Sequence, residues 1–347
     1  MRRMYGVLFA VALVVTGTAA VMAQQNAPAP TGPIPAGLPE WAYTPPIPGV
    51  KPVSVLPNDD NAVVSIPGTT KTFTRGQLRA AKETMDWYPE DRRGTVPDIA
   101  RFGKEGVRQC TLCHTPDGAG RPENAPISSF SPTYFVQQMA DFRAGLRKSA
   151  DPRKANTNVM IGFAKATTPE EDRMAAEYFA QQPYPRRIKV VEGKTAPKVR
   201  MQGGMHMPIP PNEGGGMEPI KAGDFVEVPD DNLRAEARDT RLSWTTYVPS
   251  GTLNRGKQAA AKAQCALCHG ANLEGIGAVP ALAGRSTSYL TRQLFDFKVG
   301  TRRGPWGELM RPVVANMSVQ DLMAVAAYAS SIQPPTAGQP ITTSAAR

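Results

Sequence analysis

The chain is poor in the side chains that most often bind metals, with only four cysteines and three histidines among its 347 residues. Its apolar run at residues 5–22 is only at the lower edge of the length that spans a membrane, and glycine and threonine residues weaken it further. No clear succession of alternating strands occurs in residues 96–184 or 251–334. This absence argues against the βαβ context in which a redox-active cysteine pair occurs.

The N-terminus reads MRRMYGVLFAVALVVTGTAAVMAQQ, with two arginines, an apolar stretch and the small-x-small sequence VMA at residues 21–23. This pattern predicts an export signal that is cleaved after Ala23. The alternative is an uncleaved anchor, which would associate the protein with the membrane. Both interpretations place the bulk of the chain in the periplasm, outside the cytoplasm.

The chain is basic, with 40 lysines and arginines against 30 acidic residues and a formal net charge of +10. A basic surface favours an acidic protein partner or an anionic membrane. Nucleic acid is not an expected partner, because the protein is expected to lie outside the cytoplasm.

An internal repeat is the strongest feature of the sequence. QCTLCH at residues 109–114 matches QCALCH at residues 264–269, with an offset of 155. The same offset pairs Tyr134 with Tyr289 and ADFRAG with FDFKVG, and it becomes 150 after a gap of five residues. The chain therefore contains two copies of one unit of roughly 85 residues.

Each copy carries one Cys-x-x-Cys-His motif, for which four interpretations compete. A redox dithiol does not need the adjacent histidine, and a zinc site needs four ligands brought together. A disulfide across two residues would be strained and would leave the histidine unexplained. Covalent haem attachment uses all three residues, because two thiols bond the porphyrin and the histidine binds the iron. The sequence thus predicts two haem c groups, held by Cys110, Cys113 and His114 and by Cys265, Cys268 and His269.

The sixth iron ligand is expected to be a methionine that recurs in both copies, on a loop before the last helix, because electron carriers commonly pair His with Met. Met160 and Met310 meet this condition. The alternatives are Met317 in the second copy and Met174 or Met139 in the first.

His206 is the one histidine outside the motifs, and it lies in GGMHMPIPPNEGGGM. We interpret it as a loop histidine, and the alternatives are a haem ligand or part of a Met/His copper site. Residues 24–57 are rich in proline and predict an extended linker or a strap across the surface. Short strands are expected in the segment 185–250.

The expected fold class is mostly α. Helices are predicted for residues 98–108 and 254–262 and for SYLTRQLFDFKVG, whose apolar residues have helical spacing. The last helix of the first copy has Thr168 as N-cap with Glu171 three residues later, and Ser318 and Asp321 take these places in the second copy.

These motifs resemble those of class I cytochromes c, and the whole chain resembles the two-domain diheme cytochromes c of bacterial periplasms. The resemblance covers CTLCH…Y…DF…G…M…EYFA and CALCHG…PALAG…Y…QL…F…G…M…AAYA, about half of the chain. The expected division is a signal peptide, a Pro-rich extension, a first cytochrome domain, an interdomain segment with irregular structure and short strands, a second cytochrome domain and a tail: 1–23, 24–95, 96–184, 185–250, 251–334 and 335–347.

The resemblance implies that a proline carbonyl orients each haem-binding histidine. Pro280 fits in the second copy, and Pro126 is the nearest equivalent in the first. The resemblance also suggests Arg285, Arg302 and Trp306 as contacts of the haem propionates. The first copy has no counterpart of Trp306 and has Thr115 where the second has a glycine, so the two haems are expected to differ in potential.

The expected function is electron transfer between redox protein partners, such as a dehydrogenase, a cytochrome complex or a terminal oxidase, without catalysis. A haem subunit of a periplasmic dehydrogenase complex is a related alternative. A diheme peroxidase would need an open iron site with acid–base help, and only His206 is free to give it. An enzyme of sulfur oxidation with a cysteinate ligand is disfavoured, because all four cysteines are already used.

Overall fold

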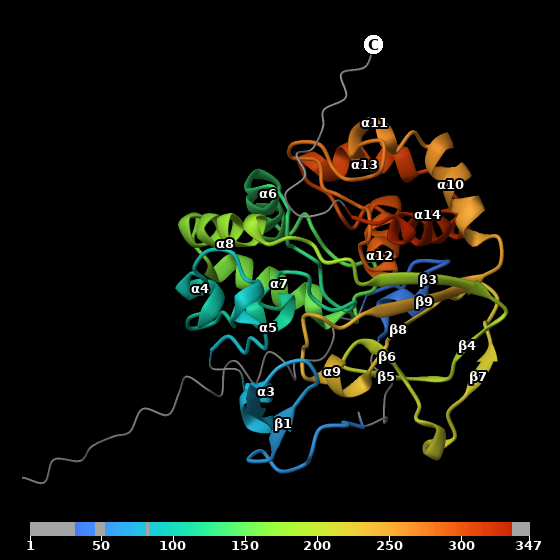
Figure 1. The fold of residues 1–347 in the computed structure, drawn as a ribbon. Coiled ribbons are helices and arrows are strands. Elements are labelled where there is room, and N and C mark those ends of the chain that lie inside the picture. The colour runs from blue at the N-terminus through green and yellow to red at the C-terminus, as the bar shows by residue number, and fades with distance from the viewer. Residues whose placement is uncertain (1–31, 46–52, 81–82, 335–347) are drawn as a thin grey trace, which may run out of the picture.

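The computed structural model describes residues 32–45, 53–80 and 83–334, so the predicted signal peptide lies outside the described residues (Figure 1). Two sets of helices follow one another along the chain. The first helical set comprises α4 (Asp98–Arg101), α5 (Cys110–His114), α6 (Pro132–Arg143), α7 (Ala155–Ala166) and α8 (Pro169–Gln181). The second helical set comprises α10 (Thr252–Lys262), α11 (Ala266–His269), α12 (Thr287–Lys298), α13 (Pro305–Val314) and α14 (Val319–Ser331).

The two sets repeat each other in register. Helices α6 and α12 have 12 residues each and begin 155 positions apart, whereas α8 and α14 have 13 residues each and begin 150 apart. The predicted caps are confirmed: Thr168 and Glu171 form a capping box, and the Ser318 side chain accepts from the backbone N–H of Asp321. Neither set contains a strand among the described residues, so the expectation of a mostly α fold is confirmed.

Short strands and turns fill the rest of the chain. Before the first helical set lie α2 (Glu40–Tyr43), β1 (Val63–Ser65), β2 (Thr72–Thr74), α3 (Arg75–Ala80) and the 3-10 turn η1 (Pro89–Asp91). Between the sets lie β3 (Ile188–Gly193), β4 (Thr195–Pro197), β5 (Val199–Gln202), β6 (Met205–Pro208), η2 (Pro211–Glu213), β7 (Met217–Pro219), β8 (Val226–Pro229), α9 (Asn232–Glu236) and β9 (Trp244–Pro249). Strands β3 and β9 pair in parallel, and β8 pairs antiparallel with β9.

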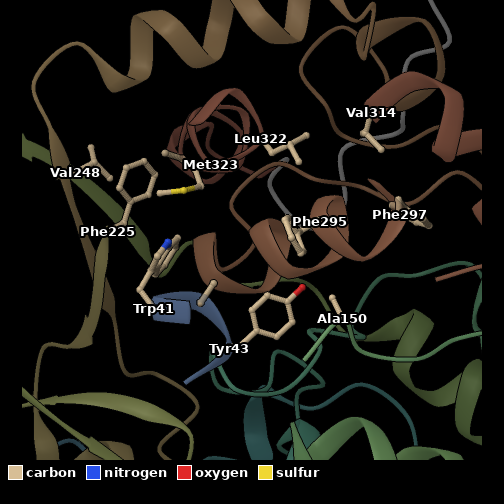
Figure 2. Close-up of a cluster of buried hydrophobic side chains, with 12 residues drawn as sticks. Trp41, Tyr43, Ala150, Phe225, Val248, Phe295, Phe297, Val314, Leu322 and Met323 are labelled. Atoms are coloured by element: carbon tan, nitrogen blue, oxygen red, sulfur yellow. The ribbon is translucent and has the colours of Figure 1, made fainter. Parts of the chain in front are cut away.

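Of the Pro-rich stretch 24–57, residues 32–45 and 53–57 are described, and we call residues 32–45, which contain α2, the N-terminal strap. Its Trp41 and Tyr43 pack into a cluster with Phe225 and with Phe295 of α12 (Figure 2). The Tyr43 hydroxyl donates to Asp296 Oδ1 at 2.7 Å, and both side chains are buried. The strap therefore fastens the N-terminal end of the described chain to the second helical set.

Two predictions about local structure are wrong. The helix expected over residues 98–108 ends at Arg101, because Gly103 and Gly106 adopt positive φ angles that interrupt a right-handed helix. The loop expected around His206 contains β6, which pairs with β5 as a hairpin. No helix within the described part of the chain is long and apolar enough to cross a membrane.

Candidate haem-binding sites

Each Cys-x-x-Cys-His motif lies on a single helical turn, so both thiols and the imidazole start from one short segment. In the first helical set α5 begins at Cys110 and ends at His114. In the second, Cys265 is the N-cap residue of α11, which ends at His269. The four cysteines form no disulfide with one another, so the disulfide alternative is not realised. The described residues also hold no group of three or more His, Cys, Asp or Glu side chains that could share one metal ion.

Both motif histidines are buried and held by a backbone carbonyl. His269 Nδ1 lies 2.8 Å from the Pro280 oxygen, so the predicted role of Pro280 as the orienting carbonyl is confirmed. His114 Nδ1 lies 2.8 Å from the Ala125 oxygen, so the prediction of Pro126 is wrong by one residue. Ala125 lies 155 positions before Pro280, and the repeat thus conserves the position of the carbonyl rather than the proline ring.

This arrangement leaves the other imidazole nitrogen available. With Nδ1–H donated to a carbonyl, the neutral ring presents the Nε2 lone pair, as ligating histidines usually do. In His269 this Nε2 is buried and has no hydrogen-bond partner. Burial lowers the pKa of both imidazoles, which favours the neutral form that binds a metal. The buried Nε2 without a partner fits a haem iron as its ligand.

The turn after each motif has the same backbone conformation in both copies, although the residues differ. Gly270 has a φ of 86° and Thr115 a φ of 61°. A β-branched residue rarely tolerates this region, and the strain is of the order of 1–3 kcal/mol. The Thr115 hydroxyl compensates, because it donates to Asp117 Oδ1 at 2.5 Å and accepts from the Gly120 N–H at 2.9 Å. The two copies therefore share this backbone conformation but stabilise it differently, and the difference in haem potential stays a prediction.

The two repeated methionines lie on helices, not on loops as expected. Met160 is in α7 and Met310 in α13, the helix before the last one in each set, and both are half-buried. Met160 packs against a small cluster that contains Met139 and Phe142. The alternative methionines do not occupy equivalent positions in the two sets. Met139 is a buried core residue of α6, whereas Met317 follows α13.

The helical sets meet through a reciprocal contact of equivalent residues. Arg302 Nη2 donates to Gln138 Oε1 at 2.8 Å, and Arg147 Nη2 donates to Gln293 Oε1 at 3.0 Å. Each arginine also donates to the glutamine of its own set, at 2.9 Å for Arg147 and 2.8 Å for Arg302. Both arginines and both glutamines are separated by the offset of 155, so the contact has an approximate twofold symmetry.

The backbone repeats this symmetry next to the arginines. The Lys148 N–H donates to the Thr301 oxygen at 2.9 Å, and the Arg303 N–H donates to the Leu146 oxygen at 2.7 Å. Both hydrogen bonds link loops that follow α6 and α12. The two sets are therefore joined by main-chain as well as side-chain contacts at one place.

Of the arginines suggested as propionate contacts, Arg302 lies at this junction, and Arg285 contacts the loop before α6 of the other set. Arg285 is 1% exposed and Arg302 is 5% exposed, and neither forms an ion pair with a carboxylate within the described residues. Arg285 donates to the Ser128 oxygen at 2.9 Å, and Arg302 donates to the Tyr134 hydroxyl at 2.7 Å. Trp306 packs edge-on against Tyr134, at 6.1 Å between ring centroids. Buried cations without carboxylate partners fit the acidic substituents of a haem.

Sequence reasoning missed Arg147 and the buried pair of Tyr43 and Asp296. Arg147 could have been found, because the offset of 155 maps it onto Arg302. The hydrogen bond of Tyr43 to Asp296 joins residues 253 positions apart, and no local sequence pattern predicts it.

Comparison with known proteins agrees with this geometry. The profile of the family described as "Cytochrome c" matches residues 253–333. Cytochrome c4 of Azotobacter vinelandii is 26% identical over 235 residues, 66% of this chain and 87% of that protein. Cytochrome c-554(548) of Halomonas halodenitrificans is 35% identical over 68 residues, 19% of this chain and 82% of that protein. The thiosulfate dehydrogenase electron acceptor of Stutzerimonas stutzeri is 40% identical over 106 residues, 30% of this chain and 44% of that protein.

Two helical units, each with a carbonyl-fixed histidine directly after a cysteine pair, define a diheme c-type cytochrome. The chain belongs to the cytochrome c family, and it binds two covalently attached haem c groups that serve electron transfer.

Proposed function

We propose that the protein is a periplasmic electron carrier in which His114 and Met160 bind one haem iron and His269 and Met310 bind the other. The observation that carries this proposal is the buried Nε2 of His269, which has no partner and whose ring is fixed through Nδ1. Each bound haem supplies a one-electron couple between ferric and ferrous iron. The protein fixes the tautomer of the imidazole, excludes water from it and offers a thioether from the following helices.

The proposed domains are residues 96–184 and 251–334, each with one complete ligand set. The junction of Arg147 and Arg302 lies between them and provides the contact through which the two redox centres communicate. Residues 1–23 are proposed as the export signal, and thioether-linked haem suits an exported carrier because it is not lost by dissociation.

Its partners are proposed to be redox proteins, with a dehydrogenase, a cytochrome complex or a terminal oxidase as donor or acceptor. The relative from Stutzerimonas stutzeri that is described as the electron acceptor of thiosulfate dehydrogenase supports this class of partner. Met closure of both irons disfavours turnover of a small substrate, as a diheme peroxidase would require.

The ligand assignment predicts the spectra of three variants. In Met160→Leu and Met310→Leu, one haem should lose the long-wavelength ferric band of thioether ligation and become high-spin, because leucine cannot bind iron. The double variant should lose the band entirely. Absorption and electron paramagnetic resonance spectra of the ferric holoprotein measure this.

Met139→Leu is the matched control, since Met139 is a buried methionine near Met160 that should not bind iron. The ligand assignment is overturned if Met139→Leu loses the band while Met160→Leu keeps it. Peroxide turnover by the unaltered protein would contradict the role of a carrier.

A further inference from the structure

The two helices that carry the proposed methionine ligands are anchored in the same way at their C-terminal ends. Arg143 Nε of α6 donates to the Ala164 oxygen at 2.7 Å, near the end of α7. Lys298 Nζ of α12 donates to the Ala315 oxygen at 2.6 Å, directly after α13. Arg143 and Lys298 are separated by the offset of 155, so this anchor belongs to the repeat.

The N-terminal end of α7 has a second anchor, which leads to the first haem motif. Asn156 lies in the first turn of α7, and its Nδ2 donates to Asn124 Oδ1 at 2.7 Å. Asn124 Nδ2 in turn donates to the Cys113 oxygen at 3.0 Å. We call Asn156, Asn124 and the Cys113 carbonyl the asparagine bridge. It joins the helix of Met160 to the turn that carries Cys113 and His114.

The surroundings of Asn124 fix the direction of its amide group. Asn124 is 9% exposed, and its Nδ2 also lies 3.2 Å from Glu123 Oε1. Arg121 Nε donates to that carboxylate oxygen at 2.8 Å. Because Nδ2 faces two acceptors, Oδ1 is the atom that accepts the hydrogen bond from Asn156. A buried amide that loses its partner is left unsatisfied, so breaking the bridge costs free energy.

The second copy has no such bridge. The offset of 155 places Val279 at the position of Asn124, and a valine side chain has no polar atom. The offset of 150 places Trp306 at the position of Asn156, and its ring packs against the other helical set. Within the described residues, no hydrogen bond joins α13 to residues 264–284. Of the two anchors, α13 therefore has only the one at its C-terminal end.

Asn156 and Met160 are four residues apart, so they lie on the same face of α7. We infer that the asparagine bridge positions Met160 on the first iron, and that Asn156 is a positioning residue for this ligand. This inference rests on the proposed function. A helical turn moves as a unit, so a competing ligand that displaces Met160 also draws Asn156 away from Asn124. The second iron lacks this restraint, and an external ligand displaces Met310 at a lower concentration.

The test measures the displacement of each methionine by imidazole in the ferric, haem-loaded protein. The Met310→Leu variant leaves the long-wavelength ferric band to the first iron, and the Met160→Leu variant leaves it to the second. Half-loss of the band should need about fivefold more imidazole in Met310→Leu than in Met160→Leu, because one hydrogen bond is worth about 1 kcal/mol. Asn156→Ala added to Met310→Leu should lower the required concentration about fivefold.

Asn158→Ala is the matched control for this substitution. Asn158 lies on the same helix, but its Nδ2 donates to the Pro152 oxygen at 3.3 Å rather than to the motif. Added to Met310→Leu, it should leave the imidazole concentration at half-loss unchanged. Asn156→Leu is a second variant, because leucine has nearly the shape of asparagine and a higher helix propensity. It should give the same change as Asn156→Ala without weakening α7.

Two results would overturn the positioning role of Asn156. One is an unchanged concentration at half-loss in both Asn156 variants, and the other is an equal fall in Asn158→Ala. A first iron that loses its methionine at the same imidazole concentration as the second would contradict it as well. A Met310→Leu protein without the long-wavelength band would instead refute the assignment of Met160, and with it the proposed function.

Discussion

At the scale of single residues, His206 shows how burial sets chemistry outside the haem sites. It lies on β6 opposite Met201, and burial lowers its pKa to about 4. The folded protein therefore holds this imidazole neutral in a range where the unfolded chain protonates it. Within the described residues, no group of three or more His, Cys, Asp or Glu side chains that could hold a metal ion includes it.

The low pKa of His206 predicts a pH dependence of stability. Between about pH 4 and 6.5 the unfolded state binds more protons at this residue, so the free energy of unfolding rises with pH. The slope from one group is at most ~1.4 kcal/mol per pH unit. His206→Gln should remove this contribution and flatten the curve in urea denaturation at pH 4, 5, 6 and 7. An unchanged slope would show that the imidazole is not held neutral.

The residue scale also shows what a repeat can and cannot predict. The carbonyl that fixes His269 was predictable from Pro280, because a proline marked the position. In the first copy the nearest proline pointed to the wrong carbonyl, since any residue provides a backbone oxygen. The hydrogen bond between Asn124 and Asn156 was not predictable, because the second copy has no counterpart of it.

At the scale of elements, helices were predicted best where a cap accompanied the apolar pattern. The helices α8 and α14 begin at the predicted caps, whereas the uncapped helix expected over residues 98–108 is only one turn long. The N-terminal strap was predicted as an extended element from its prolines. Its attachment could not be predicted, because it depends on Asp296, which is distant in sequence.

The strap predicts a measurable loss of stability when its buried hydrogen bond is removed. Tyr43→Phe leaves Asp296 without the hydroxyl that donates to it at 2.7 Å. Burial raises the pKa of Asp296 to about 6, so loss of a donor is costly there. We expect the free energy of unfolding to fall by about 1–3 kcal/mol in urea denaturation at pH 7.

Tyr247→Phe is a suitable control, because Tyr247 is a half-buried tyrosine of β9. It should change stability by less than ~0.5 kcal/mol, as surface substitutions usually do. Equal losses for the two variants would show that the strap bond contributes nothing specific.

At the scale of the whole molecule, the junction between the helical sets joins the two proposed haem domains. Arg302 and Arg147 each contact glutamines of both sets, and neither guanidinium has a carboxylate partner among the described residues. Because a positive charge destabilises the ferric form of a nearby iron, we expect these guanidinium groups to favour the ferrous form of the proposed haems. The sequence repeat already makes Arg147 and Arg302 equivalent. Their contact across an approximate twofold axis could not be predicted from it, because that contact depends on how the two helical sets pack together.

This charge predicts a change in both reduction potentials. Arg302→Gln should lower both in a spectroelectrochemical titration, because a nearby cation that disfavours ferric iron is removed. Arg302→Lys should restore most of the change, since it keeps the charge. Arg255→Gln, at an exposed arginine paired with Asp321, should leave the potentials unaltered. A change in the reduction potential of only one haem would contradict the prediction that Arg302 acts on both.

The reciprocal hydrogen bonds between residues 146–148 and 301–303 also bear on assembly. Contacts between equivalent positions are isologous, the form that two identical subunits make around a twofold axis. Duplication and fusion of a gene for a one-haem homodimer would produce such an internal interface. The same reciprocity allows the first unit of one chain to pair with the second unit of another, so concentrated protein is open to domain exchange.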